Sequence, residues 1–376
     1  MMLVLSAWLG CPEKHNNNEL SDTDLRSAMQ DRFDALQSTA AKSILVHVHI
    51  PKAGGTALSA ALSSNCKCLP ERPIVDGVSQ ANCSKCKGVK GNNGMQVAYT
   101  MSRSTGWKLG VHSPLAVMRY ILTRSEYDVR AYGVNTTYIV MLRDPFDRFI
   151  SEATNWVGRK GQAVDWSVKL TKGNETKYFK GVNLTYANGN DGTDYIKQYA
   201  SLPANFILHN RQTKMIGGSV YDFQMSFDSK VAMGSRWVPT KSTKPNYISK
   251  VYDRAARTLT EDPEVILTLQ ERFAESICIL EVLYGHLYRF NWEDSKHSHN
   301  TARNFSVANT SYTSNEQYRS VYKIWAKRNE ADSKLYKAAA RWFDVQFQVA
   351  MSVLKRKLDA KRAKRSDVPH CLEFLS

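Results

Sequence analysis

The sequence predicts an α/β protein. Two apolar runs of strand length, residues 43 to 50 and 138 to 144, each lead directly into a segment with helical character. The first run passes through a glycine turn, and the second meets Pro145, a residue that suits the first turn of a helix. A strand, a tight turn and a helix in this order open an α/β unit.

The first elements can be justified in order along the chain. Residues 19 to 42 have apolar residues at helical intervals and no Pro or Gly, which indicates a lead-in helix or stem. SILVHVHI (43 to 50) is typical of a buried strand, and TALSAALSSN (56 to 65) of a helix. From Cys66 to Gly94 the chain is rich in Cys, Lys, Gly, Asn and Pro, which predicts a loop pinned by disulfides.

The later elements alternate with polar stretches. After the strand at 138 to 144, a helix should begin at Pro145, and residues 158 to 194 should form a long polar excursion on the surface. A third helical stretch is expected over about 194 to 216. The segment 266 to 290 predicts a helix, a short strand SICIL and a second helix, and the chain ends in a long, largely helical stretch that begins near residue 316.

One main domain is expected, because no internal repeat or second compositional unit is visible. We divide the chain into an N-terminal remnant of an anchor or stem (1 to 42), the main domain (43 to 350), and a basic helix end with its tail (351 to 376).

The composition indicates a basic globular protein. With 376 residues, 43% of them hydrophobic, the chain can bury one large core. A formal charge of +16 attracts polyanions such as nucleic acid, anionic membranes or acidic polysaccharides. Between Lys323 and Arg365 there are 13 basic and 4 acidic residues, so this segment holds +9 of the total. A solvated helix face explains that cluster equally well.

Cysteines and sequons favour the secretory route. Four of the seven cysteines occur as Cys66-Lys-Cys68 and Cys83-Ser-Lys-Cys86, and this spacing favours disulfides over a zinc site by about two to one. The other three, Cys11, Cys278 and Cys371, stand apart. Six Asn-x-Ser/Thr sequons point the same way: Asn82, Asn135, Asn174, Asn183, Asn304 and Asn309.

The N-terminus leaves two interpretations open. MMLVLSAWLGC is apolar over roughly ten residues, too few to span a bilayer, and it lacks the basic residues of a good signal peptide. It fits the remnant of a membrane anchor and also an unstructured start. No later stretch is long and apolar enough to cross a membrane.

HVHIPKAGGTALSAAL (47 to 62) contains a candidate phosphate cradle. The backbone N–H groups of a glycine turn and of the first helical turn point to one place, and the positive end of the helix dipole lies there too. Lys52 precedes Gly54 and Gly55, whereas the nucleotide loop G-x-x-x-x-G-K-[ST] has its lysine after the glycines. This order argues against an ATP- or GTP-hydrolysing loop. Taken alone, the pattern also fits a tight strand-to-helix turn with a surface lysine.

LRDPFDRFIS (142 to 151) offers a second anion contact. Arg143 ends a strand and Ser151 follows eight residues later, two turns into the next helix, so both can reach one anion at the carboxyl edge of the strand. A planar guanidinium and a hydroxyl suit a terminal phosphate. The plainer alternative is that Arg143 and Asp144 only cap and pair locally.

Together these segments resemble the Golgi carbohydrate sulfotransferases. HIPKAGGT is similar to the 5′-phosphosulfate loop of that family, and LRDPFDRFIS to its 3′-phosphate element. Three further blocks resemble the heparan sulfate 6-O-sulfotransferases, in the same order. They are SRSTGWKLGVHSPL (102 to 115), HNRQTKM (209 to 215) and NEADSKLYKAAARWF (329 to 343). The resemblance runs discontinuously from about residue 43 to 350.

The resemblance implies a P-loop-like, three-layer sulfotransferase fold with a central, mainly parallel sheet flanked by helices. It also implies transfer of a sulfuryl group from 3′-phosphoadenylyl sulfate to a sugar hydroxyl. His112 would be the general base, since an imidazole titrates near neutrality, and Lys52 would stabilise the leaving phosphate oxygen without a metal. A loop histidine with a structural role is the alternative for His112.

Site residues follow by position from the resemblance. The donor would be held by Lys52, Ala53, Gly54, Gly55, Thr56, Ala57, Arg143, Ser151, Thr301 and Arg303. The acceptor sugar would meet Arg103, Trp107, Arg159 and Trp166. Asn210, Arg211 and Gln212 are expected to be structural or to support the residues that bind the ligand. The helical pattern from Leu335 to Phe343 is expected to lie in the core.

The chain departs from the family at several positions. Ala53 stands where the family usually has Thr, and Ala153 follows Ser151-Glu152 where the family has Trp. The segment 158 to 190 differs in length and composition. These departures leave the acceptor sugar open.

An anionic glycan such as a heparan sulfate-like polysaccharide is the expected partner, and no nucleic acid is expected. The implied compartment is the Golgi lumen, with type II anchoring if the N-terminal segment is an anchor. Two alternatives stay open. One is an NTP-dependent phosphotransferase, and the other is a catalytically inactive polyanion-binding protein that uses the basic C-terminal helix.

Overall fold

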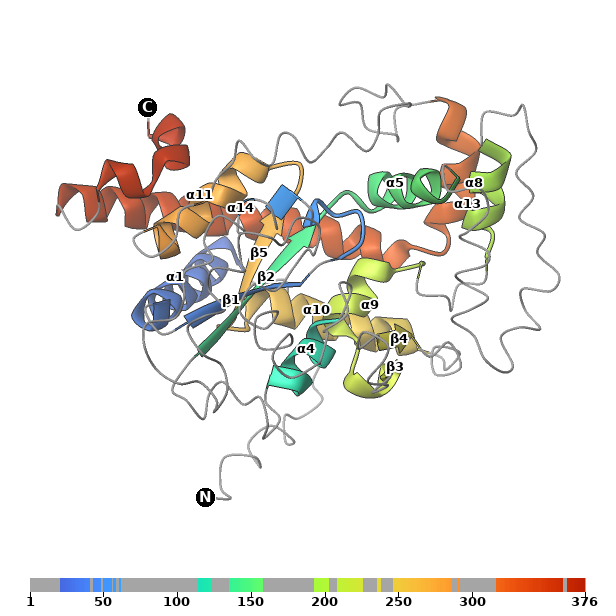
Figure 1. Ribbon diagram of the computed structural model, residues 1–376, viewed down its shortest axis with the longest axis horizontal. Coiled ribbons are helices and arrows are strands. Elements are labelled where there is room, and N and C mark those ends of the chain that lie inside the picture. Colours follow the sequence, from blue (N-terminus) through green and yellow to red (C-terminus); the bar gives the residue numbers. More distant parts are fainter. Residues whose placement is uncertain are drawn as a thin grey trace, which may run out of the picture.

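The computed structural model describes residues 21–40, 43–48, 50–55, 57–58, 61, 114–122, 135–157, 193–202, 208–225, 235–237, 246–285, 290, 316–360 and 364–375. At its centre lies a parallel sheet of three strands, β1 (Ser43–Val48), β2 (Asn135–Leu142) and β5 (Val265–Leu269), in the order β1-β2-β5 (Figure 1). Every residue of β2 after Asn135 is buried, as expected for a central parallel strand. The arrangement agrees with the predicted α/β class.

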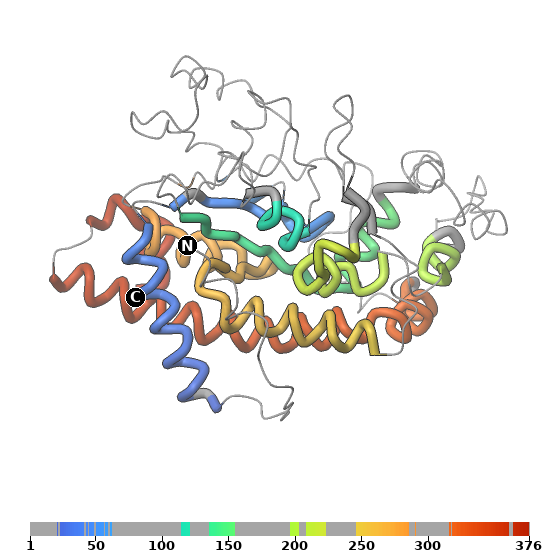
Figure 2. The backbone as a smooth tube through the Cα atoms, turned by 90° about the horizontal axis from the view of Figure 1, so that it is seen from below, coloured from blue at the N-terminus to red at the C-terminus, as the bar shows by residue number. Residues whose placement is uncertain are grey.

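Long helices cover one side of this sheet. Figure 2 shows α14 (Glu330–Asp359) and α10 (Tyr247–Thr260) running along it. Helix α11 (Phe273–Tyr284) packs between β5 and α14. Helix α1 (Asp22–Thr39) realises the predicted lead-in helix and packs on α14, with its apolar positions in the core: Leu25, Met29, Phe33 and Leu36.

A second hydrophobic cluster lies at one end of the molecule. It joins α5 (Pro145–Val157), α8 (Thr193–Ala200) and α13 (Arg319–Ala326) (Figure 1). The rings of Phe149 and Tyr199 stack there with centroids 5.5 Å apart. Because α5 follows directly from β2, this cluster holds the chain that leaves the carboxyl end of that strand.

The remaining elements are short. They are α4 (Leu115–Leu122), α9 (Arg211–Gly217), the antiparallel pair β3 (Phe223–Met225) and β4 (Ser235–Trp237), and the 3₁₀ turns Val220–Asp222, Glu316–Tyr318, Arg365–Asp367 and Pro369–Phe374. Helix α9 crosses close to α10 at Gly217, where a Cβ would lie 2.0 Å from the Val251 carbonyl oxygen. Among the described helices, none is both long and apolar enough to span a membrane.

A disulfide attaches the C-terminus to the core. Cys278 on α11 is bonded to Cys371, and both residues are fully buried. Beside it, the buried carboxylate of Glu281 accepts the His370 backbone N–H at 3.0 Å and contacts the His370 ring Nδ1 at 2.5 Å. We refer to Cys278, Glu281, His370 and Cys371 as the C-terminal clasp. The pairing of these two cysteines was not predicted from the sequence.

Two predicted elements were wrong. The helical stretch expected over about 194 to 216 is divided into α8 and α9, since the described residues 201, 202 and 208–210 are not helical. The sequence has Pro203 shortly after the end of α8, and a proline disfavours helical conformation in the residue before it. In the segment 266 to 290 the strand is VILTL, and SICIL lies inside α11. Residues 276 to 284 are buried all round, so the segment carries no amphipathic period that separates a helix from a strand.

Several other predictions are confirmed, and one lies outside the described residues. The second predicted strand and the helix starting at Pro145 are present as β2 and α5. Leu335, Ala339 and Phe343 are fully buried, as expected for core positions. The Cys-rich loop from Cys66 to Gly94 lies outside the described residues. Asn135 is half-buried and opens β2, whereas glycosylated sequons occupy surface loops.

Candidate functional site

Three chain segments leave the sheet at its carboxyl edge. The loop with Lys52 follows β1, Arg143 follows β2, and Gln270 and Glu271 follow β5. The Gln270 backbone N–H donates to the Leu142 carbonyl at 2.8 Å, which continues the pairing of β2 and β5 to this edge. In open α/β sheets, ligands bind outside the carboxyl ends of the strands.

The loop after β1 is a tight turn with left-handed backbone at two residues. Lys52 has φ 64° and Gly54 has φ 76°. The turn is closed by a hydrogen bond of 3.2 Å from the Ala53 N–H to the Ile50 carbonyl. A Cβ on Gly54 would meet Met141 Sδ at 2.8 Å and Gln270 Cγ at 2.9 Å. This position therefore requires glycine both for its left-handed backbone and for lack of space.

Helical conformation begins directly after the turn. Gly55, Ala57, Leu58 and Ala61 are helical, and the Leu58 N–H bonds the Gly54 carbonyl at 3.1 Å. The predicted order of strand, glycine turn and helix is therefore present in the described residues of this segment. Ala53 and Ala57 are buried, so they contribute backbone and packing.

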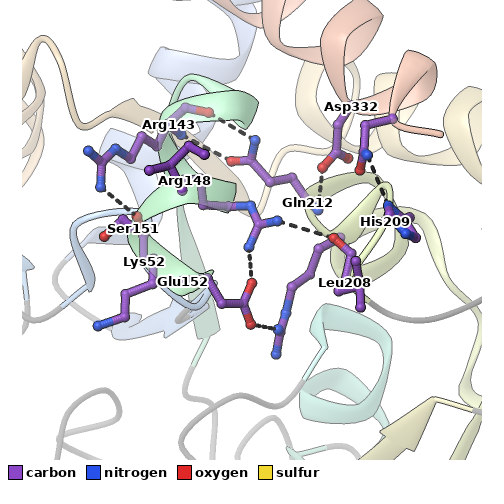
Figure 3. A network of polar contacts seen from close by, with 12 residues as sticks. Lys52, Arg143, Arg148, Ser151, Glu152, Leu208, His209, Gln212 and Asp332 are labelled. Atoms are coloured by element: carbon purple, nitrogen blue, oxygen red, sulfur yellow. Dashed lines mark hydrogen bonds and ion pairs between the residues drawn. The ribbon is translucent and has the colours of Figure 1, made fainter. Parts of the chain in front are cut away.

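Arg143 joins the two predicted phosphate-binding segments. Its Nη1 donates to the Lys52 carbonyl at 3.2 Å across 91 residues of sequence, as Figure 3 shows. Its other guanidinium N–H groups and the half-buried Ser151 hydroxyl have no hydrogen-bond partner among the described residues. These donors suit an anion.

The entry into α5 is fixed by carboxylates. Asp144 Oδ1 accepts the backbone N–H groups of Phe146 at 3.0 Å and Asp147 at 2.9 Å, which caps the helix. The Asp144 N–H donates to Glu271 Oε1 at 2.8 Å, and the hydroxyl of Tyr336 donates to Glu271 Oε2 at 2.9 Å. Burial and the Glu271 charge raise the pKa of Tyr336 above its ordinary value. Of the plainer alternative, local capping and pairing, the cap by Asp144 is present, whereas no ion pair joins Arg143 to Asp144 among the described contacts.

A buried polar network lies behind Arg143. The side-chain amide of Gln212 accepts the Arg143 N–H at 3.0 Å and donates to the Arg143 carbonyl at 2.9 Å. Asp332 on α14 accepts the backbone N–H groups of Gln212 at 3.2 Å and Thr213 at 2.7 Å. The structural role expected for Gln212 agrees with these contacts.

His209 continues the network as a neutral imidazole. Its Nε2 lies 2.9 Å from the Leu202 carbonyl, and its Nδ1 lies 3.0 Å from the amide nitrogen of Asn329. An Nε2–H tautomer satisfies both contacts. Burial lowers the pKa of His209 to about 3.

Buried charges tie α5 to α9. Glu152 accepts from Arg148 Nη1 at 2.6 Å and forms a second ion pair with Arg211. Arg148 is fully buried and also donates to the Leu208 carbonyl at 3.3 Å. Nearby, burial lowers the pKa of Lys214 to about 7, although the negative charge of Asp332 acts to raise it. We define the edge network as the following residues: Arg148, Glu152, His209, Arg211, Gln212, Asn329 and Asp332.

Several predicted site residues lie outside the described part of the chain. They are Thr56, Arg103, Trp107, His112, Arg159, Trp166, Thr301 and Arg303. Among the described predicted residues, the structure brings Lys52 and Arg143 into contact. Their roles, and that of Ser151, stay predictions.

Sequence reasoning missed Glu271 and Asp332. Glu271 follows a strand whose position was misjudged, and Asp332 lies in a helix whose role was assigned to the core. Both are acidic residues at the end or start of an element, but no spacing rule connects them to Arg143. Within the described residues, no group of three or more His, Cys, Asp or Glu side chains is placed to hold a metal ion.

Comparison with known proteins links the chain to one enzyme class. A scan of protein-family models found no match. The chain is similar to the heparan-sulfate 6-O-sulfotransferase 3-B of Danio rerio, with 28% identity over 179 residues, which are 46% of this chain and 39% of that protein. The matched region thus spans about two fifths of the relative. The similarity supports a distant relationship to a sulfotransferase.

Proposed function

We propose that the protein is a sulfotransferase that transfers a sulfuryl group from 3′-phosphoadenylyl sulfate to a hydroxyl of an anionic glycan. One observation carries the proposal. Arg143 lies in hydrogen-bond contact with the Lys52 loop at the carboxyl edge of a parallel sheet. A loop suited to one phosphate and an arginine suited to another thereby share one edge. The similarity to a sulfotransferase supports the same class.

The described residues fit the proposed donor. Gly54 lets the turn pack tightly against the edge of the sheet, because a side chain there would collide with Met141 and Gln270. The Lys52 and Gly54 conformations place the turn directly before helical residues, and the start of a helix favours an anion. Arg143 and Ser151 retain donors that suit a 3′-phosphate, which ATP lacks.

In the proposed reaction, the acceptor oxygen forms a bond to sulfur while the bond from sulfur to the phosphate oxygen breaks. His112 takes the proton of the acceptor hydroxyl, and the Lys52 ammonium stabilises the negative charge that develops on the phosphate oxygen. Thr56, Thr301 and Arg303 complete the donor site, while Arg103, Trp107, Arg159 and Trp166 contact the glycan. The glycan class follows the heparan-sulfate sulfotransferase that the chain resembles.

We further propose that the domain folds as a P-loop-like sulfotransferase domain in an oxidising compartment, the Golgi lumen. The buried Cys278–Cys371 disulfide supports this compartment, since structural disulfides persist in secretory proteins. Residues 43 to 350 form the catalytic domain in this account of the fold.

The test is a transfer assay with 35S-labelled donor and a panel of desulfated glycans. We expect transfer by the parent protein and loss of transfer in His112→Ala and Lys52→Met. Lys250, an exposed lysine on α10, offers a matched control, and Lys250→Met should retain activity. Transfer that persists in His112→Ala would remove the base assignment. An absence of transfer to every glycan would contradict the proposed function.

A further inference from the structure

We propose that Gln212 is a positioning residue that sets the preference for a 3′-phosphorylated nucleotide by holding the Arg143 backbone. The inference rests on the proposed function, because it assigns the 3′-phosphate to Arg143. It concerns a side chain that need not touch the donor. Gln212 acts instead through the residue that does.

Arg143 lies at a place where the sheet no longer fixes the chain. Strand β1 ends at Val48, which lies opposite Val140, three residues before Arg143. Strand β2 itself ends at Leu142. The backbone N–H and carbonyl of Arg143 are both taken by one amide, that of Gln212, at 3.0 and 2.9 Å. This side chain therefore replaces a strand neighbour and continues the ordered backbone by one residue.

The amide of Gln212 is itself held from two sides. The side chain is buried, with 1% of its surface exposed, so its two hydrogen bonds are protected from water. Its backbone N–H and that of Thr213 donate to the two carboxylate oxygens of Asp332 on α14. A continuous set of contacts thus runs from α14 through α9 to Arg143, and from Arg143 Nη1 to the Lys52 carbonyl (Figure 3).

The contacts of Gln212 fix the direction in which the Arg143 side chain leaves the backbone. A guanidinium binds a phosphate through parallel N–H groups, and such contacts tolerate little misalignment. Because the Arg143 backbone is fixed at both its N–H and its carbonyl, the side chain starts from one defined orientation. Loss of the amide would leave Arg143 present but less well aimed. It would also leave two half-buried backbone groups of Arg143 without this partner.

Gln346 provides a matched control. It is also buried, with 2% of its surface exposed, and its amide nitrogen donates to the carbonyl of Leu267 in the middle of β5 at 2.8 Å. Its contact lies within the strand and not at the carboxyl edge. Replacing either glutamine with methionine removes the amide and keeps nearly the same length.

The experiment measures nucleotide selectivity by calorimetry in the full chain. The readout is the ratio of the Kd for adenosine 5′-monophosphate to the Kd for adenosine 3′,5′-bisphosphate, with the thermal midpoint recorded for each variant. In Gln212→Met we expect the ratio to fall about tenfold, or ~1.4 kcal/mol. In Gln346→Met we expect a lower thermal midpoint with the parental ratio.

A parental ratio in folded Gln212→Met, or an equal fall in Gln346→Met, would overturn the positioning role. If Gln212→Met does not fold, Gln212→Asn keeps a neutral amide but is one methylene shorter, so it cannot hold the Arg143 N–H and carbonyl as Gln212 does. Its ratio should also fall, and a parental ratio there would equally overturn the proposal. A parent protein without preference for the bisphosphate would contradict the proposed function, and the positioning role with it.

Discussion

The edge network and the C-terminal clasp are both buried polar regions, but they hold the chain by different means. The clasp joins two segments with a covalent bond and one buried carboxylate. The edge network joins α5, α9 and α14 with hydrogen bonds and ion pairs alone. The disulfide of the clasp constrains the chain in the folded and the unfolded state, whereas the edge network sets the orientation of particular side chains in the folded state. We therefore expect changes in the clasp to affect stability, and changes in the edge network to affect stability and ligand binding together.

The largest effect on stability should come from loss of the disulfide. The double variant Cys278→Ala, Cys371→Ala removes a cross-link between residues 93 apart in sequence. The chain-entropy relation for a loop of this size gives a loss of about 4–5 kcal/mol in the free energy of unfolding. Urea denaturation measures this loss.

The same double variant tests whether the two regions are independent. Because the contacts of the clasp join α11 to the C-terminal turn and not to the Lys52 loop, the folded variant should bind adenosine 3′,5′-bisphosphate with parental affinity. A loss of nucleotide affinity in fully folded variant protein would show that the clasp also shapes the site, and the comparison would fail.

A smaller loss of stability is expected when the carboxylate of Glu152, which lies between Arg148 and Arg211, is neutralised. Glu152→Gln leaves the fully buried Arg148 and its neighbour Arg211 without a negative partner. Breaking a buried ion pair on one side costs about 3–5 kcal/mol, and the lower end is appropriate because the glutamine can still accept a hydrogen bond. Chemical denaturation at neutral pH gives the value.

Glu281→Gln in the clasp is the matched control for Glu152→Gln. Burial raises the pKa of Glu281, so its charged form is already disfavoured, and its replacement by a neutral amide should cost less. Equal losses in the two variants would indicate that the partners of Glu152 contribute no more than those of Glu281.

Acid should weaken the edge network through His209. The pKa of His209 is lowered from 6.5 to about 3 by burial, so between these pH values the unfolded chain binds a proton that the folded chain does not. The free energy of unfolding therefore rises with pH across this window and falls on acidification, by about 1.6 kcal/mol from pH 6.5 to pH 5. In His209→Gln, which keeps a donor and an acceptor but does not titrate, this part of the pH dependence should vanish.

The clasp should respond to acid in the opposite direction. The raised pKa of Glu281 means that the folded state binds a proton more readily than the unfolded state. This group therefore stabilises the fold at low pH and loses that contribution as pH rises through its folded pKa.

The His209 prediction has its own contradicting outcome. A pH profile of unfolding that is the same in His209→Gln and in the parent would contradict the assignment of a neutral, buried His209.

Local signals in the sequence were sufficient for the elements around the loop. The apolar run before Lys52, the glycine turn and Pro145 each impose a conformation on their own neighbours, so β1, the turn, β2 and the start of α5 could be predicted. Helix α11 could not, because Ile277 and Ile279 are buried on every side and carry β-branched side chains that also suit a strand. Burial in this helix is decided by its neighbours and not by its own pattern.

Contacts between distant residues were also beyond the reach of local patterns. Gln212 meets Arg143 across 69 residues and Asp332 across 120. Cys278 meets Cys371 across 93. Their side-chain types permit many partners, and only the packing of α9, α11 and α14 selects among them. The residues of the site could thus be nominated from the sequence, while the means of holding Arg143 required the three-dimensional arrangement.

The most direct test of the central claim compares two nucleotides on one protein. Calorimetric titration of the parent protein with adenosine 3′,5′-bisphosphate and with ATP, repeated for Arg143→Ala, asks whether the carboxyl edge recognises the 3′-phosphate of a sulfuryl donor. We predict that the bisphosphate binds at least about tenfold more tightly than ATP, a difference of ~1.4 kcal/mol, and that Arg143→Ala abolishes this difference. Equal or tighter binding of ATP by the parent protein would contradict the account.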